Sequence, residues 1–128
     1  MVRDYQPSDL AEIISLHKEQ GLDYSLPDLN SPLCIVKKVR VEGGRVVGLM
    51  FLRLTAEAFL VVSGSPVAKG RAIEELQPEV LSEAFAKGLD EISCVVPPEL
   101  VDSFQPVLDR FDWSRDRDGW VLYTRATR

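Results

Sequence analysis

A run of small residues separates an apolar segment from a helical pattern in the middle of the chain. The apolar segment is FLVV at residues 59–62, and SGSP follows it at residues 63–66. A helical pattern then covers residues 70–87 and ends before Gly88. The start of a helix presents free backbone amides and the positive end of the helix dipole. A strand, a small-residue loop and a helix in this order therefore predict a site for a phosphate-bearing ligand.

Histidine and cysteine are the next candidates for a base, a nucleophile or a metal ligand. His17 is the only histidine, and it lies at the edge of an apolar helical stripe, where it could be a base or a partly buried structural residue. Cys34 and Cys94 each lie inside an apolar run, which is typical of reduced, buried cysteines. One histidine and two separated cysteines do not make a metal site, so no metal is expected.

The composition is that of a globular protein. The chain has 128 residues, of which 45% are hydrophobic and 27% are charged, and its net charge is −5. This length is typical of one domain, which we expect to cover residues 1–128. The negative charge argues against a general nucleic-acid binder. Neither a leader nor a membrane-spanning run is recognised, so we expect a cytoplasmic protein without a membrane partner.

Turn residues and hydrophobic periodicity divide the chain into strands and helices. Ser8 is a suitable N-cap for the first helix and Gly21 a suitable end, and Gly43-Gly44 predicts a hairpin turn. The segment 22–32 could be a plain connecting loop or a cover over a pocket. We expect strands at 2–5, 33–41, 45–54, 59–62 and 89–96, helices at 9–20, 70–87 and 98–111, and a hairpin at 113–117 and 120–125. The strands at 33–41, 45–54 and 59–62 predict an antiparallel meander, and Pro78 predicts a kink in the second long helix.

This order of elements resembles the GNAT superfamily of acyl-CoA-dependent N-acyltransferases over nearly the whole chain. The resemblance is carried by VRDYQPSDL at residues 2–10, by GRVVG at residues 44–48, and by the helix end and strand at residues 84–92. It implies an α/β (α+β) domain in which helices flank a mixed, mostly antiparallel, splayed sheet of about six or seven strands. In the family, pantetheine lies in the splay between the fourth and fifth strands. The pyrophosphate lies on the loop that opens the following helix.

The family's signature loop, Gln/Arg-x-x-Gly-x-Gly/Ala, is matched in part by VAKGRA at residues 67–72. Gly70 and Ala72 match the second half of the motif, whereas Val67 replaces the first Gln or Arg. The resemblance implies that backbone amides of this loop bind the pyrophosphate of acetyl-CoA, with Lys69 and Arg71 as additional cationic contacts. The cofactor-binding residues that it implies are Val61, Val62, Val67, Ala68, Lys69, Gly70, Arg71 and Ala72.

The catalytic groups of the family are matched less well. Many members use a tyrosine in the penultimate helix as general acid, and Leu108 stands at that position here. Tyr24 and Tyr123 are alternative acids without positional support. The family's usual general base is a carboxylate near the fourth strand, and Glu57 is the nearest candidate, with a solvated turn glutamate as the alternative. Asp23 and Tyr24, in the loop after the first helix, are the candidates for binding the substrate.

Two functions from different classes remain open. The first is an enzyme that transfers an acetyl group from acetyl-CoA to a small-molecule or peptide amine. The second is a catalytically inactive GNAT-like domain that binds a protein or another ligand, which Val67, Leu108 and Pro78 favour. A homodimer through the terminal hairpin, with Trp113 and Trp120 exposed, is compatible with either function.

Overall fold

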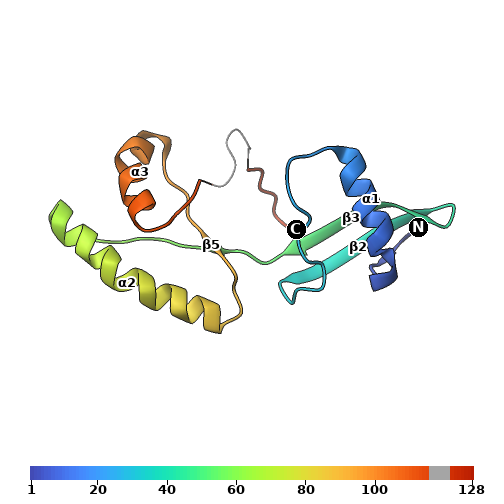
Figure 1. Cartoon of the computed structure of the whole chain (residues 1–128), viewed down its shortest axis with the longest axis horizontal. Helices are drawn as coiled ribbons and strands as arrows, with labels where there is room; N and C mark the ends of the chain where they lie inside the picture. The colour runs from blue at the N-terminus through green and yellow to red at the C-terminus, as the bar shows by residue number, and fades with distance from the viewer. Residues whose placement is uncertain (116–121) are drawn as a thin grey trace. The chain divides into compact units, whose positions relative to one another are not determined.

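The computed structural model describes residues 1–115 and 122–128. These residues form a mixed α/β structure with three α-helices, an antiparallel sheet of three strands and a parallel pair of strands (Figure 1). The mixed α/β class expected from the sequence is therefore confirmed. The chain divides into two compact units. Unit 1 comprises Met1–Ala58 and Ser82–Ser93, and unit 2 comprises Phe59–Leu81 and Cys94–Arg128.

The antiparallel sheet of unit 1 has the strand order β1-β2-β3. It contains β1 (Val2–Asp4), β2 (Cys34–Glu42) and β3 (Arg45–Arg53). Gly43 and Gly44 join β2 to β3 with φ angles of +58° and +76°, which glycine adopts without steric cost. A tight turn with two positive φ angles matches the twist of the strands it joins. The two long predicted strands and the turn between them are thereby confirmed.

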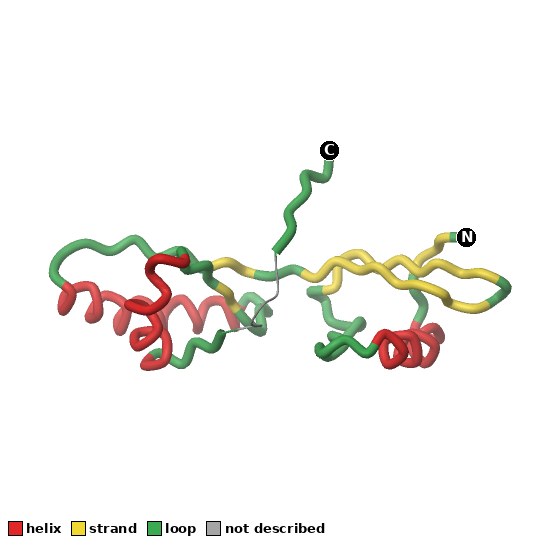
Figure 2. The backbone as a smooth tube through the Cα atoms, turned by 90° about the horizontal axis from the view of Figure 1, so that it is seen from above, coloured by secondary structure: helices red, strands yellow, loops and turns green. Residues whose placement is uncertain are grey.

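One face of this sheet is covered by α1 (Leu10–Gln20), as Figure 2 shows. The helix follows a single 3-10 turn, η1 (Pro7–Asp9), and ends at Gly21, whose φ is +66°. The segment 22–32 returns the chain to the sheet without forming a helix or a strand, as predicted. The buried core of unit 1 consists of Ile13, Leu29, Val39 and Val46.

An ion pair joins β1 to the start of α1. Both terminal nitrogens of Arg3 donate to the carboxylate oxygens of Asp9 at 2.8 Å, and the backbone amide of Gln6 donates to the same carboxylate at 2.8 Å. Asp9 is only 5% exposed. Arg3, and then the Gln6 amide, lower the pKa of Asp9 to about 2 because both bind the ionised form. The carboxylate therefore stays charged inside the fold.

Unit 2 is built around two helices. The first is α2 (Pro66–Ala86), of which residues 66–81 belong to unit 2 and residues 82–86 to unit 1. The second is α3 (Val101–Arg110), which follows a 3-10 turn, η2 (Pro98–Leu100). Pro78 lies inside α2, which continues through it as one helix. This continuity agrees with the unbroken apolar stripe of the sequence.

Three predictions about the middle of the chain are wrong. Residues 59–62 do not form a strand. The strand that follows β3 is β4 (Ala56–Glu57), which lies earlier in the chain than predicted. It pairs in parallel with β5 (Ile92–Ser93) and not with β3, so the predicted antiparallel meander does not include it. The strand predicted at 89–96 is thereby reduced to β5. α2 begins at Pro66 and not at the predicted Gly70. Ser65 has the preference of an N-cap residue and Pro66 the preference of a first-turn residue, so the helix starts there.

The predicted terminal hairpin has its turn and Trp120 among residues 116–121, which lie outside the described residues. The described neighbours at 113–115 and 122–128 contain no strand. The prediction that Trp113 is exposed is wrong, because Trp113 is half-buried and its indole nitrogen donates to Gln77. The homodimer, the single domain and the cytoplasmic location stay predictions. In the part of the chain that the structure describes, none of the helices combines the length and apolar composition that crossing a bilayer requires.

Candidate functional site

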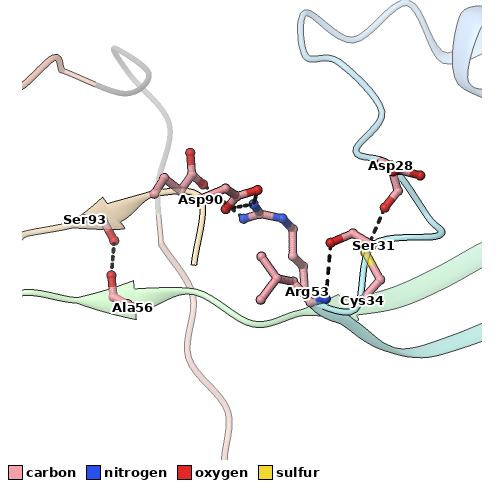
Figure 3. Close-up of polar contacts among 9 residues, drawn as sticks. Asp28, Ser31, Cys34, Arg53, Ala56, Asp90 and Ser93 are labelled. Atoms are coloured by element: carbon pink, nitrogen blue, oxygen red, sulfur yellow. Dashed lines mark hydrogen bonds and ion pairs between the residues drawn. The ribbon is translucent and has the colours of Figure 1, made fainter. Parts of the chain in front are cut away.

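The parallel pair of β4 and β5 lies in unit 1, where the chain leaves the antiparallel sheet. The hydroxyl of Ser93 donates to the carbonyl oxygen of Ala56 at 3.3 Å (Figure 3). The backbone amide of Ala58 donates to the carbonyl oxygen of Ser93 at 2.7 Å. Strand pairing ends with this bond, because the backbone groups of residues 59–62 and 94–96 make no hydrogen bond within the described structure. We call the bonds between Ala56–Ala58 and Ile92–Ser93 the β4–β5 ladder.

A cluster of charged side chains lies at the start of this ladder. Arg53 is the last residue of β3, and its Nη2 lies 2.6 and 2.7 Å from the two carboxylate oxygens of Asp90 (Figure 3). Its Nη1 donates to Glu91 at 3.1 Å. The Arg53 side chain is only 19% exposed, and the Asp90 carboxylate raises its pKa. Arg53, Asp90 and Glu91, here named the Arg53 cluster, join the residues before β4 to those before β5.

The end of α2 brings Asp90 to Arg53. Gly88 has a φ of +86° and donates its amide to the carbonyl of Phe85 at 3.0 Å, while Leu89 donates to the carbonyl of Ala84 at 3.0 Å. A left-handed glycine with such bonds closes a helix and turns the chain away from the helix axis. The sequence predicts Gly88 as the helix end. The ion pair beyond it has no local sequence signal, because its partners are 37 residues apart.

Residues 59–62, which belong to unit 2, follow the ladder directly and contain the predicted pantetheine contacts. The side chains of Phe59 and Val61 are 82% and 94% exposed, and Val62 is half-buried. Their backbone donors and acceptors are unbonded within the described structure. Free backbone amides and carbonyls in a row can pair with the amide groups of a ligand. The binding of pantetheine by Val61 and Val62 stays a prediction.

The predicted pyrophosphate motif at residues 67–72 lies inside α2, so the prediction of a loop before Gly70 is wrong for residues 67–69. The hydroxyl of Ser65 accepts the amide of Ala68 at 3.2 Å, and the Ser65 carbonyl accepts the amide of Lys69 at 2.9 Å. Ser65 is therefore the N-cap of α2, and Pro66 begins the helix. Backbone amides from residue 70 onward bond within the helix and are not free for a phosphate. The role of residues 67–72 in cofactor binding stays a prediction.

Lys69 and Arg71 cannot act as a pair on one ligand. Both side chains are exposed, but residues two apart in a helix point to nearly opposite sides. Lys69 is also closer to the positive end of the helix than Arg71. Gly70, between them, shows no close approach, because a Cβ placed there would meet no atom of the described structure within 4 Å. Lys69 is therefore the better candidate for a contact with phosphate.

The predicted base and substrate-binding residues lie in unit 1. Glu57 is an exposed residue of β4 and forms no ion pair within the described residues. Asp23 is exposed in the loop after α1. The ring of Tyr24 meets the ring of His17 edge-on, with centroids 4.9 Å apart and an interplanar angle of 79°. Nε2 of His17 is buried without a hydrogen-bond partner, which favours the structural alternative for this histidine.

The position expected to hold the catalytic acid offers no proton donor. Leu108 lies in α3 and is half-buried, and Tyr123 is an exposed residue of the described C-terminal segment. Tyr24 lies in the loop of unit 1, in contact with His17. The assignment of Tyr24 or Tyr123 as the general acid therefore stays a prediction.

The two cysteines are free thiols, as expected. Cys34 is buried and donates to the carbonyl oxygen of Asp28 at 3.4 Å (Figure 3). Cys94 is half-buried, and burial raises the pKa of its thiol, which disfavours the reactive thiolate. Within residues 1–115 and 122–128, no group of three or more His, Cys, Asp or Glu side chains could hold a metal ion.

Comparison of the chain with protein-family models, with curated proteins and with solved structures found no match. The site therefore rests on its own residues. Sequence reasoning missed Ser65 as the N-cap of α2, although a serine followed by proline is a recognisable helix start. It also missed the Arg53 cluster and the pairing of Ser93 with Ala56, which bring together residues far apart in the chain.

Proposed function

We propose that the chain is a GNAT-like acyl-CoA-dependent N-acetyltransferase that binds acetyl-CoA through residues 59–62 and the start of α2. The observation that carries this proposal is the β4–β5 ladder, a parallel pair whose hydrogen bonds stop at Ala58 and Ser93. A parallel pair whose hydrogen bonds end before a long helix is the feature that the family resemblance leads us to expect where pantetheine binds. The larger mixed sheet of six or seven strands belongs to the same proposal.

The unbonded backbone of residues 59–62 would pair with the amides of pantetheine. The pyrophosphate would then lie at the N-terminus of α2, where the helix dipole and the free amide of Val67 favour an anion. Lys69 would add a charge-assisted contact. This arrangement places the anion site closer to Ser65 than the motif at residues 67–72 implies.

In the transfer step, the nitrogen of a small-molecule or peptide amine attacks the thioester carbonyl carbon. The new C–N bond forms as the C–S bond breaks, and the thiolate of coenzyme A takes up a proton. A general base would accept the proton that the amine loses, and Glu57 is the candidate that the family resemblance implies. Orientation of the two reactants supplies much of the rate enhancement in such a reaction, so a dedicated acid at Leu108 is not essential.

Calorimetric titration with acetyl-CoA, coenzyme A and pantetheine tests the binding proposal. We expect saturable binding of all three ligands, and coenzyme A should bind more tightly than pantetheine because only it carries the pyrophosphate. Lys69→Glu should weaken coenzyme A binding about fivefold while leaving pantetheine binding unchanged. Arg71→Glu is the matched control, since it makes the same charge change on the other side of the helix. Absence of binding by the unmodified chain would refute the proposal.

A second candidate is a GNAT-like domain that binds its ligand or a partner protein without transferring an acyl group. The observation that favours it is Leu108, which cannot donate a proton, together with Glu57, which is exposed and forms no ion pair with any described residue. Release of free thiol from acetyl-CoA in the presence of a panel of amines distinguishes the two candidates. Saturable binding without amine-dependent thiol release would establish the second one.

A further inference from the structure

We propose that Arg53 and Asp90 are positioning residues that set the register of the β4–β5 ladder, and thereby the point at which acyl-CoA meets the chain. This inference rests on the proposed function. It concerns a pair of residues that neither the signature motif nor the catalytic assignments include. Every contact that carries it lies within unit 1.

The ladder is too short to hold its own register. It pairs only Ala56 with Ile92 and Glu57 with Ser93. Isolated two-stranded structures are marginally stable in water even when they are longer. The two strands are also parallel, so no tight turn connects them, and the long segment between them contains all of α2. Side-chain contacts are therefore needed to specify which residues pair.

The Arg53 cluster makes such a contact at the start of both strands. Arg53 precedes β4, Asp90 precedes β5, and parallel strands begin at the same end of their ladder. Two Arg–carboxylate bonds of 2.6 and 2.7 Å from one nitrogen, with a third bond from Nη1 to Glu91, allow little sliding. The Arg53 side chain is 19% exposed, whereas Asp90 and Glu91 are 61% and 68% exposed, so the geometry of the bonds and not their burial restricts sliding.

A slip of one residue would change the far end of the ladder. It would remove the bond from the Ala58 amide to Ser93 and the bond from the Ser93 hydroxyl to Ala56. It would also exchange the faces to which the side chains of β5 point, because side chains alternate along a strand. The last paired residue before residues 59–62 would then shift, and so would the free backbone groups offered to pantetheine.

Amide hydrogen exchange of Ala58 in the ligand-free protein tests this register directly. In Arg53→Gln we expect the Ala58 amide to exchange at least tenfold faster, while the amide of Val39 in the core of β2 changes much less. Arg53→Lys keeps the charge but not the forked geometry, so its Ala58 exchange rate should lie between those of the unmodified chain and Arg53→Gln. Arg40→Gln, which breaks the exposed pair with Glu42 in the same sheet, is the matched control and should leave Ala58 unchanged.

Two results would overturn the positioning role. One is unchanged exchange at Ala58 in Arg53→Gln. The other is an increase at Ala58 equal to that at Val39, which would show only a general loss of stability.

Acetyl-CoA affinity is measured on the same variants, and we expect it to fall with Ala58 protection. If Ala58 loses protection while affinity is unchanged, the register does not define the site, and the inference fails while the proposed function stands. If the unmodified chain does not bind acetyl-CoA, the proposed function fails, and loss of Ala58 protection still supports the register role.

Discussion

The indole nitrogen of Trp113 lies 2.9 Å from the side-chain oxygen of Gln77 and donates a hydrogen bond to it. The side-chain nitrogen of the same glutamine donates to the carbonyl oxygen of Phe111 at 3.2 Å. Gln77 therefore uses both ends of its amide to hold the segment after α3 against α2. Both bonds are partly buried, where a polar group that loses its partner is not readily compensated by water.

Gln77→Ala should lower the free energy of unfolding by about 1–3 kcal/mol, because it leaves the Trp113 N–H and the Phe111 carbonyl without partners. Urea denaturation followed by circular dichroism measures the change. Gln20→Ala, at the exposed end of α1, is the control and should have little effect. Equal stability of the two variants would contradict the role assigned to Gln77.

Asp9→Asn should change how stability depends on pH. The pKa of Asp9 is lowered from 3.8 to about 2 by Arg3 and by the Gln6 amide, so the folded chain binds this proton more weakly than the unfolded chain. The ionised carboxylate therefore stabilises the fold fully above about pH 4, and this contribution is lost as the pH falls toward about 2. We expect the variant to be less stable than the unmodified chain at neutral pH.

The free energies of unfolding of the two chains should converge between about pH 4 and about pH 2, because both then lack the charged side chain. Urea denaturation over this range provides the measurement. Glu19→Gln removes an exposed carboxylate of α1 that forms no ion pair in the described structure, and it serves as the control. A stability difference that is the same at every pH would disprove the assignment.

Ser65→Ala should destabilise the start of α2. The hydroxyl of Ser65 accepts the Ala68 amide, and loss of an N-cap of this kind costs about 1 kcal/mol. Thermal unfolding and amide exchange in the first turn of α2 provide the readout. Ser63→Ala, two residues earlier in the exposed loop, is the matched control and should behave like the unmodified chain. Indistinguishable exchange in the two variants would show that the helix starts elsewhere.

Pro78→Ala should stabilise α2. Proline cannot donate to the carbonyl of Glu74, and its ring crowds that turn of the helix, so alanine restores a bond and raises stability by up to about 3 kcal/mol. Helicity and the urea midpoint should both rise. Pro98→Ala is the control, because a proline in the first turn of η2 lacks only a donor that would be unbonded in any case. A decrease in helicity would contradict this prediction.

The local features of the fold could be predicted from the sequence, because each depends on residues that are close together in the chain. Gly21 and Gly88 end α1 and α2 with positive φ angles, and Gly43-Gly44 makes the turn between β2 and β3. Helical periodicity located all three α-helices and showed that α2 continues through Pro78. The start of α2 is also encoded locally, by Ser65 and Pro66, although the helical pattern was predicted to begin only at Gly70.

Only the tertiary structure decided which segments pair beyond the first sheet. Composition alone makes residues 59–62 a good strand, yet a strand forms only where backbone groups find partners, and the pairing goes to β4 and β5 instead. The two-residue ladder and the Arg53–Asp90 pair join segments separated by all of α2. Closing so long a connection costs chain entropy. The residues next to either strand in the chain do not indicate which distant segment will pair with it. The amino-acid sequence thus determined where the helices and turns lie, and long-range pairing determined which backbone groups after β4 are without hydrogen bonds in the described structure.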